Sequence, residues 1–235
     1  MSKRLVWDQT GQKTYETGVQ KCVLYPQSSE GTYPKGVAWS GVTGVNKSPS
    51  GAEPTAIYAD DIKYLSLMSA EDFSATITAY STPEEFDECD GSAEIAEGVT
   101  VGQQDRRPFG LCDRTTIGND VKQNKYGYKL NFIYGALAKP SARDSKTINE
   151  SPEAIELSYE MSTTPVSVSG MKPTATLEVD STKADPEKLK KLEDIIYGTE
   201  TEDARLPLPD EIASIMKGET SASETPSGNE SQVAG

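Results

Sequence analysis

Asp72-Phe73-Ser74-Ala75-Thr76-Ile77-Thr78-Ala79-Tyr80 is the stretch that decides the fold class. Its apolar residues alternate strictly with polar ones, and a period of two that includes β-branched residues predicts a strand with one buried face. Segments 126–137, 154–161 and 174–180 show the same period, and shorter candidates lie at 20–25, 36–45 and 107–116. Strands that are polar on one face predict antiparallel sheets with one face in water. The chain is therefore predicted to be mainly β.

The apolar side of each predicted strand is expected to lie in the core. These inward positions are Phe73, Ala75, Ile77 and Ala79; Tyr128, Leu130, Phe132 and Tyr134; Ile155, Leu157, Tyr159 and Met161; and Ala175, Leu177 and Val179. Between two of these strands, Thr82 as cap and Pro83 at the first helical position predict a short helix, which Gly91 ends.

The composition changes near residue 181. Asp185 and Pro186 predict the start of a helix that ends at Gly198, with an apolar stripe at Leu189, Leu192, Ile195 and Ile196. A second short helix is predicted over 210–217, and residues 218–235 are too polar to bury a core. The predicted organisation is a β domain over 1–180, a helical appendage over 181–217 and a disordered tail over 218–235.

Residues 46–58 are predicted to form a long exposed loop. Pro49, Gly51 and Pro54 stand there among small polar residues, and such residues are typical of turns and loops. Long loops in compact domains are often functional or become ordered on binding.

Composition excludes several function classes. The chain has 235 residues and no histidine, which removes His-based catalysis, Ser-His-Asp triads and His-ligated metal sites. Its three cysteines, Cys22, Cys89 and Cys112, are widely spaced and form no CxxC pair, which is typical of buried thiols in a reducing compartment. Apolar runs of ~18 residues are absent, so neither a membrane span nor a secretory signal is expected.

The formal net charge of −14 argues against a protein that binds nucleic acid tightly, because such binding needs clustered Lys and Arg. An acidic surface would suit DNA that must slide past without sticking, since like charges repel. A plain acidic protein has the same charge, so charge alone leaves both interpretations open.

Three short motifs suggest chemistry, and each has a simpler interpretation. Tyr58-Ala59-Asp60-Asp61 has the YxDD pattern of polymerases, but this chain is short and acidic. The acids between Glu84 and Asp90 lack calcium-loop spacing and suit a solvated helix face. Gly41-Val42-Thr43-Gly44 lacks the Gly-Lys-Ser/Thr ending of a phosphate loop, so it is interpreted as a turn. No catalytic, cofactor or metal site is expected.

A series of segments resembles the major tail tube protein of long-tailed, non-contractile bacteriophages of Gram-positive hosts. The resemblance covers roughly residues 5–216, and none of its segments is a catalytic signature. The segments include Ala38-Trp39-Ser40-Gly41, Ser48-Pro49-Ser50-Gly51-Ala52-Glu53-Pro54, Thr82-Pro83-Glu84-Glu85-Phe86, Arg107-Pro108-Phe109-Gly110-Leu111-Cys112, Tyr126-Gly127-Tyr128-Lys129-Leu130 and Leu192-Glu193-Asp194-Ile195-Ile196-Tyr197-Gly198.

The resemblance implies a structural virion protein with an antiparallel β-sandwich and one flanking helix. Six copies would form a ring by joining their sheets, and rings would stack into a hollow, acidic tube through which double-stranded DNA passes without specific binding. The implied partners are further copies of the chain, a tape-measure protein, and the tail-tip and tail-terminator proteins. The implied location is the virion tail, after synthesis in the host cytoplasm, with no membrane anchor.

Two groups of residues become assembly candidates on this basis. Candidates for the lumen come from the polar faces of two predicted strands, and the outer wall is their equally open alternative: Asp72, Ser74, Thr76, Thr78, Glu156, Ser158 and Glu160. Candidates for contact between rings come from the predicted loop: Lys47, Ser48, Pro49, Ser50, Gly51, Ala52, Glu53 and Pro54.

Two other classes of function remain as alternatives. A monomeric β-sandwich module for adhesion or carbohydrate binding would expose a groove of aromatic side chains. A metal-dependent enzyme would bind magnesium or manganese at Asp60 and Asp61. Self-association without an added partner separates the tube protein from both.

Overall fold

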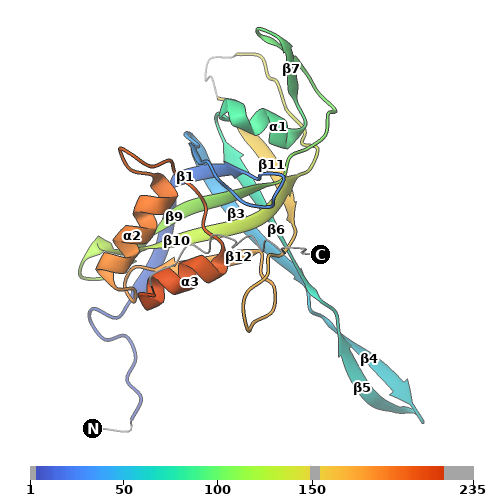
Figure 1. Cartoon of the computed structure of the whole chain (residues 1–235). Coiled ribbons are helices and arrows are strands. Elements are labelled where there is room, and N and C mark those ends of the chain that lie inside the picture. The colour runs from blue at the N-terminus through green and yellow to red at the C-terminus, as the bar shows by residue number, and fades with distance from the viewer. Residues whose placement is uncertain (1–3, 149–153, 220–235) are drawn as a thin grey trace, which may run out of the picture.

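The computed structural model describes residues 4–148 and 154–219 of the chain (Figure 1). With 46% strand and 13% helix, it confirms the mainly β, antiparallel prediction. In chain order the elements are β1 (Thr14–Pro26), β2 (Val37–Ala38), β3 (Val42–Gly51), β4 (Pro54–Ala59), β5 (Ile62–Met68), β6 (Glu71–Ala79), the 3-10 turn η1 (Glu84–Phe86), α1 (Asp87–Asp90), β7 (Ala93–Ala96), β8 (Val99–Val101), β9 (Phe109–Asn119), β10 (Gln123–Ala138), β11 (Leu157–Thr163), β12 (Thr176–Asp180), α2 (Pro186–Tyr197) and α3 (Pro209–Lys217).

One antiparallel sheet of eight strands organises the body, in the order β2-β1-β9-β10-β11-β6-β3 with β12 also paired to β10. The long strand β10 pairs with two strands along one of its edges, since Lys129–Ile133 pair with β12 and Ala136–Ala138 pair with β11. The strands β11, β6 and β3 therefore leave the sheet at one end of β10, and β3 and β1 come into contact. The two halves enclose a common apolar core.

Strands β1, β9 and β10 separate two apolar clusters. Alternate residues point to opposite sides, so Leu111 joins the cluster shared with β6 and α1 whereas Cys112 joins the cluster under the C-terminal helices. The prediction of sheets with one wet face is therefore wrong for the central strands, because α2 and α3 cover their second face. The alternation in β6 is confirmed, with Ala75, Ile77 and Ala79 buried.

The C-terminal helices form a layer of the same body. Asp185 caps α2 as predicted, because its Oδ1 accepts hydrogen bonds from the backbone N–H of Glu187 at 3.0 Å and of Lys188 at 3.2 Å. Leu192 and Ile196 are fully buried against the sheet. The change at residue 181 thus marks a change of secondary structure within a continuous core. The predicted disordered tail lies outside the described residues from 220 onward.

Two local predictions need correction. Pro83, not Thr82, is the N-cap of the short helical segment, which is a 3-10 turn followed by the single turn α1. The expected inward position Ile155 precedes β11 and is 41% exposed.

The predicted loop at 46–58 is wrong in secondary structure. Lys47 to Gly51 continue β3 and pair with β6 as far as Gly51 opposite Glu71. Pro54 begins β4, which pairs with β5 to form a hairpin that projects from the body (Figure 1). Pro49 fits because β3 is an edge strand, where the missing N–H interrupts no ladder on the outer side. We call residues 52–70, with β4 and β5, the arm.

Candidate assembly surfaces

The structure gathers all seven lumen candidates on one polar surface of β6 and β11. Cross-strand pairs Thr78 with Ser158 and Thr76 with Glu160 fix the shared face, because residues directly opposite in a ladder point to the same side. Glu156 joins them through Thr43, whose hydroxyl lies 2.5 Å from Glu156 Oε1. We call the surface formed by the seven candidates the polar face. It lies opposite the core side of β6.

A polar network holds β3 to the other half of the sheet. Lys47 Nζ donates to Asn131 Oδ1 at 2.9 Å and forms an ion pair with Glu178 Oε1 at 2.7 Å. Asn131 Nδ2 in turn donates to Asp113 Oδ2 at 2.9 Å. Burial raises the pKa of Asp113, and Lys47 lowers the pKa of Glu178. Lys47 thus anchors the root of the arm within its own subunit.

Beyond Pro54, the arm exposes apolar side chains on both of its sides. Ile62 and Leu67 share one side and are 65% and 56% exposed, while Met68 on the other side is 70% exposed, because β5 pairs with β4 across a bulge. An isolated two-stranded hairpin is at best marginally stable in water, and apolar surface of this kind marks interaction sites. These residues were not among those predicted from the sequence. The apolar composition of residues 62–68 could have indicated a strand, but apolar and polar residues do not alternate strictly there.

Two edges of the sheet are open. In the described part of the chain, β3 pairs only with β6, and β1 before Val23 pairs only with β9. Such edges present unpaired N–H and C=O groups to another chain. The predicted joining of sheets between subunits therefore has strands available at both ends.

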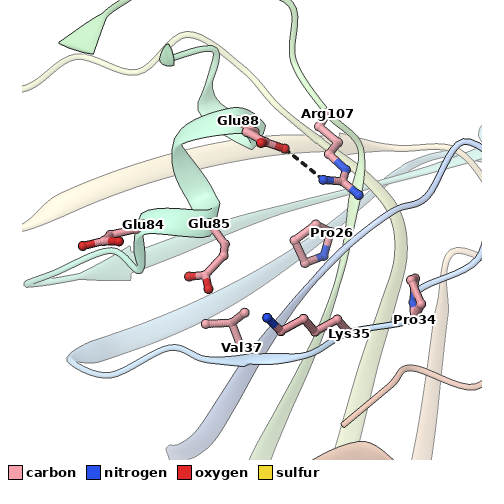
Figure 2. A pocket seen from close by; sticks show the side chains of 8 residues that line it. All are labelled: Pro26, Pro34, Lys35, Val37, Glu84, Glu85, Glu88 and Arg107. Carbon is pink, nitrogen blue, oxygen red and sulfur yellow. Dashed lines mark hydrogen bonds and ion pairs between the residues drawn. The ribbon is translucent and has the colours of Figure 1, made fainter. Parts of the chain in front are cut away.

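A surface pocket of about 370 Å³ lies between β2 and the η1–α1 segment (Figure 2). Glu84, Glu85 and Glu88 line it together with Lys35 and Arg107, and Arg107 Nη1 donates to Glu88 Oε2 at 2.9 Å. The balance of its lining is acidic. We call it the acidic pocket.

The chemical motifs do not converge on one site. Asp60 and Asp61 occupy the tip of the arm, far from the acids of α1 (Figure 1). Among the described residues, no group of three or more Cys, Asp or Glu side chains is placed to hold a metal ion. The cysteines are buried, and burial raises the pKa of Cys89 to about 12. A membrane-crossing helix is absent from the described residues.

Comparisons with known proteins add no relative. No protein-family model matches the chain, and no curated protein matches it.

Proposed function

We propose that this protein is the subunit of a phage tail tube, in which hexameric rings stack into a hollow conduit for double-stranded DNA. The observation that carries the proposal is the arm, an exposed apolar hairpin that extends an open-edged sheet beyond the body. A surface of this kind is suited to burial against further copies of the chain. The resemblance of the sequence to tail tube proteins supports the same assignment.

The polar face is proposed to line the bore. It contains Asp72, Glu156 and Glu160 among hydroxyl side chains, and it lies on the far side of the core from α2 and α3. Water wets such a face, and its acids repel a DNA backbone instead of holding it. The helical layer then forms the outer wall of the tube.

The contact between rings is proposed to involve the arm from Pro54 onward. Residues 47–51 belong to a paired strand, and Lys47 already bonds to its own subunit. Ala52, Glu53 and Pro54 form the transition into the apolar hairpin. A tape-measure protein and the tail-tip and tail-terminator proteins are the proposed further partners, and the virion tail is the proposed location.

The arm's aromatic residues fit the carbohydrate-binding alternative poorly. Tyr58 and Tyr64 are each 69% exposed on a two-stranded hairpin, and neither lines the acidic pocket or the other cavities described below. These two exposed rings therefore do not line a groove of the kind that this alternative predicts.

Negative-stain electron microscopy of the purified protein across a concentration series tests the proposal. Rings or hollow tubes are the expected result. If the protein stays monomeric, the series is repeated with a purified tail-tip complex and tape-measure protein. A subunit that remains monomeric under both conditions would contradict the tube assignment.

A further inference from the structure

The tip of the arm carries two acidic side chains that the proposed function leaves unexplained. Asp60 and Asp61 form the turn between β4 and β5, with φ of 50° and 61°. Both are exposed, and neither forms a hydrogen bond or ion pair with the residues that the structure describes. Nine residues separate Asp60 from Gly51 at the end of the main ladder, so the tip stands ~30 Å from the root. It presents two adjacent carboxylates away from the body.

A basic cavity lies at the opposite end of the molecule. It has a volume of about 250 Å³, and its lining includes Arg106, Lys139, Arg143 and Asp90. We call it the Arg106 pocket. Lys139 is paired with Glu160, whereas no described residue forms an ion pair with Arg106 or Arg143.

Two polar atoms of the Arg106 pocket are buried without a partner. These are Arg106 Nε and Asp90 Oδ1. A buried donor without an acceptor is costly, so native structures normally satisfy it with protein or another ligand. A carboxylate that enters the pocket would supply an acceptor for Arg106 and a counter-charge for Arg143.

Strand β6 runs from the root of the arm toward the Arg106 pocket. Glu71 at its start adjoins the root of the arm, and Ala79 at its end pairs with Leu157, which lines the pocket beside Ser158 and Tyr159. The strand has nine residues, so the two features are ~30 Å apart along it. Figure 1 shows the arm and the α1 region at opposite ends of the body. A surface at one end that fits the other end favours head-to-tail association.

Three other cavities of the described residues lack a basic lining. The acidic pocket has three Glu against Lys35 and Arg107. A groove along α2 and α3 has more acids than bases, and one beside β12 has equal numbers. On a chain with 37 acidic and 23 basic residues, the Arg106 pocket thus differs from these three cavities and suits an anionic side chain.

We propose that Asp60 and Asp61 at the arm tip of one copy dock into the Arg106 pocket of a second copy in the next ring. The inference rests on the proposed function and specifies where the arm ends. The pocket's guanidinium groups orient the tip, while the apolar sides of the arm supply most of the buried area. Charge pairs of this kind set partner orientation and association rate.

The test is a cross-linking experiment on full-length chains. One variant carries Ala59→Cys beside the tip, which keeps both aspartates, and a second carries Ser141→Cys at the pocket. The native cysteines are buried and do not compete for a short bis-maleimide reagent. Mixing the two variants should give a heterodimeric cross-link. The matched control replaces Ser141→Cys by Glu85→Cys in the acidic pocket, and its yield should be about tenfold lower.

Charge variants decide whether the carboxylates are responsible. Asp60→Asn with Asp61→Asn keeps residues that tolerate positive φ, and it should lower the cross-link yield about tenfold. Arg143→Asp should lower the yield similarly, and pairing it with Asp61→Lys on the arm should restore it. Thermal melting checks that each variant is folded. Equal yields at the two pockets, or insensitivity to these charges, would overturn the inference.

Electron microscopy of the same samples separates this inference from the proposed function. Tubes that form normally with Asp60→Asn and Asp61→Asn, and without the Ser141→Cys cross-link, would reject the docking site and leave the tube assignment intact. Absence of both tubes and cross-links, with and without tail-tip complex and tape-measure protein, would reject both.

Discussion

Replacing Ile62 and Met68 by Thr should uncouple tube assembly from folding. Both side chains belong to β5, one on each side of the hairpin, and they are 65% and 70% exposed in the subunit. Thr keeps the β-propensity of the strand, and surface changes of this kind alter the free energy of unfolding by only ~0.5 kcal/mol. The melting temperature of the isolated subunit should therefore hardly change.

The expected loss on assembly follows from these exposures. Full burial of a large apolar side chain contributes ~2 kcal/mol, so covering the exposed parts of Ile62 and Met68 contributes ~2.7 kcal/mol together. Since every ~1.4 kcal/mol corresponds to a tenfold change in an equilibrium constant, the critical concentration for tube growth should rise about hundredfold. Sedimentation of tubes at a series of protein concentrations measures it directly.

Lys63→Thr is the matched control, because it changes an exposed residue of the same strand that is charged instead of apolar. It should raise the critical concentration much less than the double variant. If the double variant assembles at the concentration of the unmodified protein, the arm is not buried between subunits, and the reasoning from its exposed apolar surface is wrong.

Three further predictions concern the fold. Leu192→Ala should lower the free energy of unfolding by ~3 kcal/mol in chemical denaturation, because Leu192 is fully buried between α2 and the sheet. Gly135→Ala should lower the melting temperature, since Gly135 has a φ of 57° and a Cβ there would lie 2.2 Å from the Thr164 carbonyl oxygen. Lys47 keeps the pKa of Glu178 below its ordinary value of 4.5, so this carboxylate stabilises the fold above that pH and the contribution is lost as pH falls through the lowered pKa. Glu178→Gln should therefore reduce stability at pH 7 and flatten its decrease in acid, as measured by urea denaturation at several pH values.

Sequence alone predicted the parts of the fold that local patterns determine. The alternation of 72–80 predicted β6 because a strand with one side on a core needs that period. Asp185 and Pro186 predicted the start of α2 because the cap and the first turn are satisfied locally. Thr82 failed as a cap because Pro83 adopts the extended cap position and η1 starts one residue later than expected.

The arm could not be predicted because its residues give conflicting local signals. Gly51 has a φ of 81° and lies so close to the Ala70 carbonyl that a Cβ would stand 2.4 Å from its oxygen, so glycine is needed at the bend between ladder and hairpin. In the sequence, this glycine between two prolines indicated a loop. The burial of β9 on both sides also depends on α2 and α3, which lie far away in the sequence. A period of two in a strand's own sequence does not show that helices distant in the chain will cover its second side.

The symmetry of an assembly determines which surfaces of its subunits meet. No single sequence motif of one chain encodes that symmetry. The chain places its features at separate positions: the arm at one end of β6, the Arg106 pocket at the other, and the polar face along the length between them. When copies associate head to tail, a contact that joins opposite ends repeats, because each added copy brings a free arm or a free pocket. Open sheet edges on β1 and β3 add a second, sideways direction of growth. Closure in the sideways direction and repetition along the arm would together produce a tube, whereas a monomeric binding module would have no use for either.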